Sequence, residues 1–282
     1  MNQSIELGRM NRLKIQRHEP HGMYLVAKDD DYVLLPNAYV SVSMKIDDEI
    51  DVFVYTDSED RYVATTIEPD VMRSEFGYLE VVDVVPFGAF CNWGLPKDLF
   101  VPKGMQKTPF KVGQKRVVRV VHDKESDRLI GVEKFGQYLS KQRPDFEVNQ
   151  QVKLFILAKT PLGFKAIINN RFEGMLFKNE IFESLEIGQR KVGYVKQVRS
   201  DGKIDLALQP VGADASSAAA EAKVMQVLRE NDYHIPYNYK TDPEVINNVF
   251  GLSKKAFKRT LTALQEKKAI SVSDEGISFL NS

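Results

Sequence analysis

Histidine and cysteine, which often catalyse reactions or bind metals, are scarce in this sequence and show no grouping typical of a site. The four histidines have no metal-ligand spacing; they are His18, His21, His122 and His234. No cysteine pair, nucleophile motif or glycine-rich phosphate loop is present. Carboxylates gather at residues 29–31 and 47–49, but both segments are typical of solvated turns. We therefore expect no enzyme, no catalytic residue, and no metal or cofactor.

Four cations open a helical segment near the C-terminus, and their type and position suit nucleic-acid binding. They are Lys254, Lys255, Lys258 and Arg259. A helix N-terminus attracts phosphate, and cations beside it would add to that attraction. The helix dipole, however, favours acidic side chains at this end, so four cations there do not stabilise the helix. That mismatch favours a functional role, although lysine-rich surface helices are common and winged helices also dock proteins. We predict that these four residues contact nucleic acid.

Three copies of one unit make up most of the chain that precedes these cations. Two separate landmarks recur at offsets of 66 and 75 residues, and a third recurs at 67 and 75. The landmarks are Gly22, Gly88 and Gly163; Ile46, Val112 and Ile187; and Arg61, Arg128 and Lys203. Because separated landmarks share their offsets, the sequence indicates an internal repeat, with one extra residue placed in a turn.

The second copy shows its strands most clearly. Residues 78–85, 87–93, 98–101, 115–122 and 128–133 are β-branched or alternating runs separated by turn residues. Five short strands in about 65 residues predict a small closed barrel, which leaves no exposed strand edge. We therefore expect a mainly β chain with three five-stranded barrels, at residues 1–68, 69–140 and 146–210.

The remaining segment predicts an α+β winged-helix domain at residues 218–282, after a linker at 211–217. Helical spacing covers residues 218–230. Asp242 and Pro243 start a second helix that ends at Gly251, and Ser253 caps a third helix over residues 254–268. Residues 270–273 and 277–280 then form a hairpin.

The second copy resembles an S1-type OB-fold domain. The resemblance rests on the Gly-Tyr-x-x-x-Val-x-x-Val-x-Phe-Gly-Ala-Phe run at 77–90 and on Val-Gly-Gln-Lys-x-x-Val-x-Val-Val at 112–121. The first and third copies are degenerate relatives, the first acidic and the third basic. Three such units followed by a winged helix are similar to the bacterial conserved virulence factor B family of S1-like RNA-binding regulators. This domain order covers nearly the whole chain.

The resemblance implies roles for particular residues of the second barrel. Phe87 and Phe90 would stack on unpaired bases, each for roughly 1–3 kcal/mol. They are three residues apart, so we expect Gly88 to permit a bulge or bend that turns both outward. Asp123 and Arg128 bracket the turn before the last strand, where the arginine would contact phosphate and the aspartate would orient it.

Further RNA contacts are predicted on all three barrels. Stacking positions in the first barrel hold aromatic rings, and the second and third barrels carry cations. The additional residues are His21, Tyr24, Lys103, Lys115, Arg119, Lys165 and Lys178. Arg119 alternates with Val118 and Val120 and is therefore expected to face outward. Val101 stands where the family has a histidine.

Charge and composition limit the partners. The chain has 282 residues, with 39 basic and 39 acidic side chains. Residues 1–69 hold 7 basic and 13 acidic residues, whereas residues 141–210 hold 12 and 8, so the third barrel should attract phosphate more than the first. The N-terminus has no signal-like apolar run, no membrane-length apolar stretch occurs, and Cys91 is the single cysteine. We expect a cytoplasmic monomer without a membrane partner.

The sequence therefore predicts a regulatory protein that binds single-stranded RNA with low sequence specificity and strong salt dependence. It would affect gene expression after transcription, including virulence-factor expression by family resemblance. The alternative is a DNA-binding transcription regulator, whose winged helix contacts the duplex and whose barrels dock partners. Substitution of Phe87 and Phe90, compared with substitution of Lys255 and Lys258, would distinguish the two hypotheses.

Overall fold

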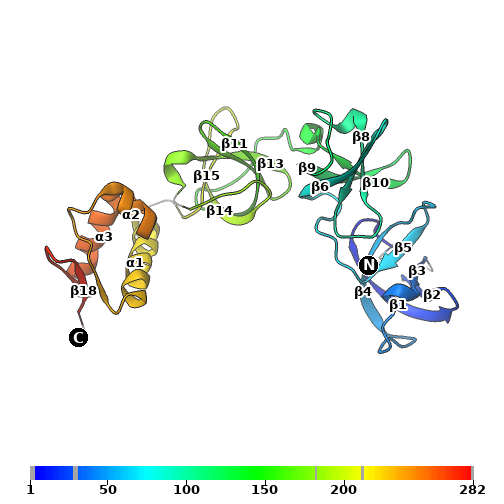
Figure 1. Ribbon diagram of the computed structural model, residues 1–282, viewed down its shortest axis with the longest axis horizontal. Coiled ribbons are helices and arrows are strands. Elements are labelled where there is room, and N and C mark those ends of the chain that lie inside the picture. Colours follow the sequence, from blue (N-terminus) through cyan, green and yellow to red (C-terminus); the bar gives the residue numbers. More distant parts are fainter. Residues whose placement is uncertain (1–3, 28–30, 182, 211–212, 281–282) are drawn as a thin grey trace. The chain divides into compact units, whose positions relative to one another are not determined.

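The computed structural model describes residues 4–27, 31–181, 183–210 and 213–280, with side chains from residue 219 onward in the last range. The chain divides into two compact units, Met1–Leu139 and Ser140–Ser282. Three successive sets of five strands precede three helices and a short three-stranded sheet (Figure 1). The chain is thus mainly β with a C-terminal α+β domain, as the sequence predicts.

Each set of five strands forms one small barrel. Barrel 1 contains β1 (Met10–Glu19), β2 (Gly22–Val26), β3 (Tyr32–Pro36), β4 (Glu49–Thr56) and β5 (Tyr62–Thr65). Barrel 2 contains β6 (Phe76–Val85), β7 (Gly88–Asn92), β8 (Leu99–Pro102), β9 (Lys115–Asp123) and β10 (Arg128–Val132). Barrel 3 contains β11 (Gln151–Thr160), β12 (Gly163–Ile168), β13 (Phe172–Phe177), β14 (Arg190–Val198) and β15 (Ile204–Ala207).

The three barrels share one strand order. Barrels 1 and 3 are closed in the orders β1-β2-β3-β5-β4 and β11-β12-β13-β15-β14. Barrel 2 has the equivalent order β10-β9-β6-β7-β8, but it is an open sheet: its edge strands β8 and β10 lie side by side without the hydrogen-bonded ladder that closes the other two, so the closed barrel predicted for this copy is incomplete. Alternate residues of the strands fill each interior, as the period of two requires.

The backbone confirms the threefold repeat that the sequence offsets indicate. After the first turn of each barrel, a 3-10 helix returns one N–H to a carbonyl of that turn. The bonds run from Asn37 to His21 (3.2 Å), from Lys103 to Phe87 (2.9 Å) and from Lys178 to Leu162 (2.9 Å). Each first strand also has one bulge, at Gln16, Val82 and Leu157. Both features recur at the offsets of 66 and 75.

Barrels 1 and 2 share a continuous hydrophobic core, so the first unit folds around both of them. Phe53 of barrel 1 meets the single tryptophan, Trp93 of barrel 2, edge to face at 5.9 Å. Trp93 donates its indole N–H to the Lys97 carbonyl at 2.6 Å, and Lys97 Nζ in turn donates to the Asp57 carbonyl at 2.5 Å. A buried core that includes residues of both barrels predicts joint unfolding.

The C-terminal domain has the predicted winged-helix elements. They are α1 (Ala213–Glu230), β16 (His234–Ile235), α2 (Pro243–Phe250), α3 (Lys254–Glu266), β17 (Ile270–Val272) and β18 (Ile277–Phe279) (Figure 1). The Asp242 side chain accepts from Glu244 N, Ser253 accepts from Ala256 N, and Gly251 ends α2 with φ 65°. These caps confirm the predicted starts of α2 and α3. The short strand β16 was not predicted.

The predicted linker at residues 211–217 is wrong from residue 213 onward, because α1 already begins there. Residues 211 and 212 lie outside the described part of the chain. The run is rich in alanine, the strongest helix former, which outweighs the serines that suggested a flexible segment. The other domain boundaries stay predictions. Of the acidic segment at 29–31, residues 29 and 30 also lie outside the described residues.

Candidate nucleic-acid interface

Three phenylalanines form an exposed aromatic cluster on barrel 2. Phe87 is 65% exposed, and Phe90 and Phe100 are half-buried. The Phe100 ring centroid lies 5.8 Å from that of Phe87 and 5.2 Å from that of Phe90. Their neighbours Ala89, Leu99 and Val101 point into the core, so the rings stand on the outer surface of the barrel. We call Phe87, Phe90 and Phe100 the aromatic cluster.

Phe87 and Phe90 share a face for a different reason from the one predicted. Phe87 lies in the two-residue turn before β7, so strand alternation does not apply to it. The bulge is in β6 at Val82, not at Gly88. Gly88 instead makes room for Phe100, because a Cβ at this position would lie 2.4 Å from the Phe100 ring. The Phe100 ring therefore packs directly against the backbone of Gly88.

Phe100 is a candidate contact that the sequence reasoning missed. The motif directs attention to Phe87 and Phe90, and to Val101 as the position of the family's histidine. Val101 is fully buried and is therefore unable to contact a ligand. Phe100 pairs directly with Phe90 across β7 and β8. The alternation of the strand at residues 98–101 was the available signal, since either Phe100 or Val101 had to face outward.

Of the predicted cations around barrel 2, Lys103 lies beside the aromatic cluster. It is exposed, and its backbone N–H donates to the Phe87 carbonyl. Lys115 is also exposed, but it pairs with Glu80, which is five residues from Val85, the last residue of β6 before the turn that holds Phe87. That separation is roughly 17 Å at the usual rise per strand residue. Lys103 and Lys115 therefore do not form one compact site.

Arg119 is not on the surface, contrary to the prediction. It is 9% exposed, and its guanidinium lies 5.0 Å from the Phe76 ring and 6.0 Å from the Tyr138 ring. Burial lowers the pKa of this guanidinium. The alternation of β9 does turn Arg119 out of the barrel, but the segment after β10, with a 3-10 helix at Phe135–Tyr138, covers it. The alternation of residues along a strand shows which side of its own sheet a side chain faces, but it does not show whether a later segment covers that side.

Asp123 and Arg128 are already bonded to other side chains of the first unit. Asp123 accepts from the Ser126 hydroxyl at 2.5 Å, and this bond, outweighing burial, lowers the pKa of the Asp123 carboxyl. Arg128 pairs with Asp60 of barrel 1. The two predicted contact residues therefore order the β9–β10 turn and join barrels 1 and 2.

Asp127, in the same turn, makes a contact between the barrels that predicts a pH effect. It accepts from His122 Nε2 at 2.7 Å and from the Tyr62 hydroxyl of barrel 1 at 3.0 Å, and these bonds lower the pKa of Asp127. A carboxyl whose pKa is lowered by folding stabilises the fold at pH values above its pKa in the unfolded chain, about 3.9. That stabilisation is lost as the pH falls through the pKa of the folded state.

In Tyr62→Phe we expect the Asp127 pKa to rise toward its ordinary value in a carboxyl NMR titration. Asp201 of barrel 3 is the internal control, and an unchanged Asp127 pKa would refute the contact.

Barrel 1 presents a smaller aromatic site. His21 occupies the position of Phe87 and is exposed, and Tyr24 occupies that of Phe90 and is half-buried. The Arg17 guanidinium lies over the Tyr24 ring at 4.2 Å and also pairs with Glu19. Since Arg17 covers Tyr24, that face of the ring is already in contact. Arg17 is a second neighbour that the sequence reasoning missed.

Barrel 3 has no aromatic ring at either stacking position. Leu162 replaces Phe87 and is 63% exposed, whereas Lys165 replaces Phe90 and pairs with Glu173 at 2.7 Å. Lys178 follows β13 and is exposed. Lys165 is thus partly neutralised, and Lys178 is the more available of the two predicted cations.

The predicted cations of α3 lie together. Lys255, Lys258 and Arg259 are exposed and Lys254 is half-buried, while Phe257, Leu261 and Leu264 face the core. The first turn of α3 contains no acidic residue. Among the described residues, these four cations make no ion pair, so α3 presents a positively charged surface.

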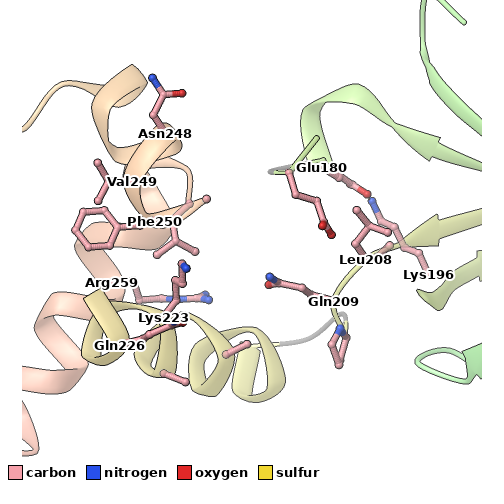
Figure 2. Close-up of a pocket in the computed structure, with 17 residues that line it drawn as sticks. Glu180, Lys196, Leu208, Gln209, Lys223, Gln226, Asn248, Val249, Phe250 and Arg259 are labelled. Carbon is pink, nitrogen blue, oxygen red and sulfur yellow. The ribbon is translucent and has the colours of Figure 1, made fainter. Parts of the chain in front are cut away.

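A hollow of about 940 Å³ occurs in the second unit (Figure 2). Its lining includes Glu180 and Lys196, which pair with each other, and Lys223, Gln226 and Arg259. These polar residues come from the 3-10 helix at Lys178–Glu180, β14, α1 and α3, and they show no catalytic arrangement. Within the described ranges, no group of three or more metal-binding side chains occurs.

Among the described helices, none has both the length and the apolar character required to cross a membrane.

Comparisons with known proteins agree with this architecture. An S1 domain family model matches residues 7–67, and a CvfB-like winged helix domain model matches residues 222–279. The S1 match falls on barrel 1, although the S1-type sequence motif is more complete in barrel 2. The domain content is therefore of a nucleic-acid-binding kind and not a catalytic kind.

Relatives match over most of the chain. The protein YitL of Bacillus subtilis is 28% identical over 93% of this chain and 90% of its own length. Conserved virulence factor B of Staphylococcus epidermidis is 21% identical over 88% of this chain and 81% of its own. A crystal structure of a multidomain protein with nucleic acid binding domains from Streptococcus pneumoniae is 22% identical, with 97% and 98% coverage and a TM-score of 0.41. The chain thus carries an S1 domain in barrel 1 and a CvfB-like winged helix domain at its C-terminal end, and it is similar over most of its length to YitL and to proteins named conserved virulence factor B.

Proposed function

We propose that this protein binds single-stranded RNA through the aromatic cluster of barrel 2 and regulates gene expression after transcription. The observation that supports it most directly is the exposure of Phe87 beside Phe90 and Phe100. Exposed, clustered phenylalanines are unusual on a monomer surface, because burying such rings is favourable. Unpaired bases expose π faces that stack on such rings whatever their sequence, so the proposal includes low sequence specificity.

The charge distribution supports binding by several weak surfaces and not by one strongly basic face. Net charge is zero, and the available cations are spread over Lys103, Lys178 and α3. Linked weak sites increase affinity through their effective concentration on one strand. Because each phosphate contact releases counterions, affinity should fall steeply with salt. An effect on virulence-factor expression is part of the proposal only through the name of the Staphylococcus relatives.

Location and oligomeric state follow as further parts of this proposal. We place the protein in the cytoplasm, where RNA is regulated and thiols stay reduced. Its single cysteine, Cys91, is buried, and burial raises the pKa of its thiol to about 12, so the thiol is unreactive. We propose a monomer, which light scattering during gel filtration would check.

The direct test is an affinity titration of the full chain against single-stranded RNA and against duplex DNA of equal length. Fluorescence anisotropy at several salt concentrations would give both the affinity and its salt dependence. We expect tighter binding to the single-stranded RNA. Equal or tighter binding to the duplex would contradict the proposal and favour the second candidate, in which the cations of α3 contact duplex DNA.

The α3 cations provide a second prediction. In Lys255→Gln with Lys258→Gln, we expect affinity for single-stranded RNA to fall no more than about threefold, because the stacking rings remain. Any duplex binding should fall more, about tenfold, since each lost cation removes a phosphate contact. Arg229→Gln with Lys268→Gln, which removes the same charge from two exposed positions outside α3, is the matched control. A larger loss for RNA than for duplex would instead make α3 the main RNA site.

A further inference from the structure

Barrel 3 buries a carboxylate where the other two barrels have an apolar side chain. Asp205 is 4% exposed, and its repeat equivalents are Val63 and Ile130, at the offsets of 67 and 75. Burying a carboxylate is costly unless ionic partners compensate for the lost hydration. Because barrels 1 and 2 form with valine and isoleucine at this position, the fold itself does not require Asp205.

Asp205 fixes the side chain of Arg199. Arg199 Nε lies 2.9 Å from one carboxylate oxygen of Asp205 and 3.0 Å from the other, and Gln197 Nε2 donates to the same carboxylate at 2.5 Å. The Arg199 guanidinium also lies over the Phe177 ring, 5.5 Å from its centroid. One edge and one face of the guanidinium are therefore held in place.

The opposite edge of Arg199 remains available. The side chain is 40% exposed, and among the described residues neither Nη atom has a hydrogen-bond partner. A planar guanidinium with its Nε edge anchored presents its two Nη groups as a fork, which fits two oxygens of one phosphate. Since Asp205 and Phe177 already order the side chain, less entropy is lost when it binds a ligand.

Arg199 lies on the face that corresponds to the aromatic cluster of barrel 2. Phe177 pairs with Gly163, the residue after Leu162, which is the counterpart of Phe87. Asp205 pairs with Met175, the counterpart of Phe100. Lys178, exposed, directly follows Phe177. The equivalent surface of barrel 3 thus carries an anchored arginine and a lysine in place of stacking rings.

We propose that Arg199 binds a backbone phosphate of single-stranded RNA, with Asp205 and Phe177 as its positioning residues and Lys178 as a second cation. This inference rests on the proposed RNA-binding function and assigns barrel 3 a role distinct from that of barrel 2. Barrel 2 contacts bases by stacking, whereas barrel 3 contacts the strand through its charge.

The test uses the full chain, a labelled 20-nucleotide oligouridylate and anisotropy over a range of salt concentrations. Arg199→Gln with Asp205→Asn replaces the ion pair by two amides and leaves net charge unchanged. Arg199→Lys keeps both the charge and a partner for Asp205 but removes the fork. Lys153→Gln is the control, because Lys153 is an exposed cation toward the opposite end of β11 from Thr160 and Gly163. Thermal unfolding of every variant would confirm that barrel 3 stays folded.

We expect the double variant to bind about fivefold more weakly and to lose about 0.7 from the slope of log affinity against log salt, the value for one phosphate on a single strand. Arg199→Lys should bind about threefold more weakly, and Lys153→Gln should stay within about twofold of the wild type. If the effect were general charge, Lys153→Gln would weaken binding and the net-neutral double variant would not. That outcome, or wild-type affinity in both Arg199 variants, would overturn the inference and leave the role of barrel 2 intact. A wild-type protein that fails to bind the oligouridylate would overturn both proposals.

Discussion

Replacing Phe87 and Phe90 together by alanine is expected to weaken binding of single-stranded RNA by about two orders of magnitude. Each ring that stacks on a base contributes roughly 1–3 kcal/mol, and about 3 kcal/mol for the pair corresponds to roughly 150-fold. Phe87 is mostly exposed, so its removal should cost little folding free energy. The measurement is anisotropy with the same RNA at one fixed salt concentration, because affinities at different salt are not comparable.

Phe100→Ala separates stacking from charge on the same surface. Phe100 contacts both other rings, so its loss should weaken binding by about tenfold without changing the salt slope. Tyr78→Ala is the matched control, since Tyr78 is an exposed aromatic residue of the same barrel, on β6 and away from the Phe87 turn. Unchanged RNA affinity in a folded variant that lacks Phe87 and Phe90 would remove the basis of the proposed function.

Phe53→Ala is expected to destabilise barrels 1 and 2 together, by about 3–5 kcal/mol of unfolding free energy. Phe53 is fully buried in barrel 1 and packs against Trp93 of barrel 2. Trp93 is the only tryptophan, so its fluorescence during urea denaturation reports on barrel 2 while the substitution lies in barrel 1. We expect one transition with a lower midpoint and a similar slope, because the two barrels share a core.

Ile168→Ala supplies the control for this experiment. Ile168 is buried in barrel 3, in a core cluster that contains no residue of barrels 1 and 2. It should therefore leave the Trp93 transition where it is in the wild type. If Phe53→Ala instead left the Trp93 transition at its wild-type midpoint, barrel 1 would unfold without barrel 2, and the shared core would not be cooperative.

The sequence predicts the architecture well because its information is repeated and local. Three copies at constant offsets define three barrels even where the motif is weak, and Asp242, Gly251 and Ser253 act through bonds to residues two to four positions away. Such bonds depend on chain-local geometry and not on distant packing. The linker is the exception, since its serines and alanines favour different local structures.

The candidate site is harder to predict because it depends on what lies over and beside each strand. Arg119 does face away from its barrel, but a segment from later in the chain buries it. Arg128 stands where the motif places a phosphate contact, yet it meets Asp60 of the neighbouring barrel. Phe100 joins the aromatic cluster because its ring packs over Gly88 of the neighbouring strand. In each case the deciding partner is more than ten residues away in sequence.

The backbone hydrogen bond that closes the first turn of each barrel does not involve the side chain of the residue that accepts it. His21, Phe87 and Leu162 accept this bond through their carbonyls alone, while their side chains all lie exposed. Substitution at these positions therefore leaves the turn intact while replacing the group offered to a ligand. Duplicated copies of such a barrel are free to diverge in what they recognise, ring by ring or charge by charge, without selection having to rebuild the scaffold.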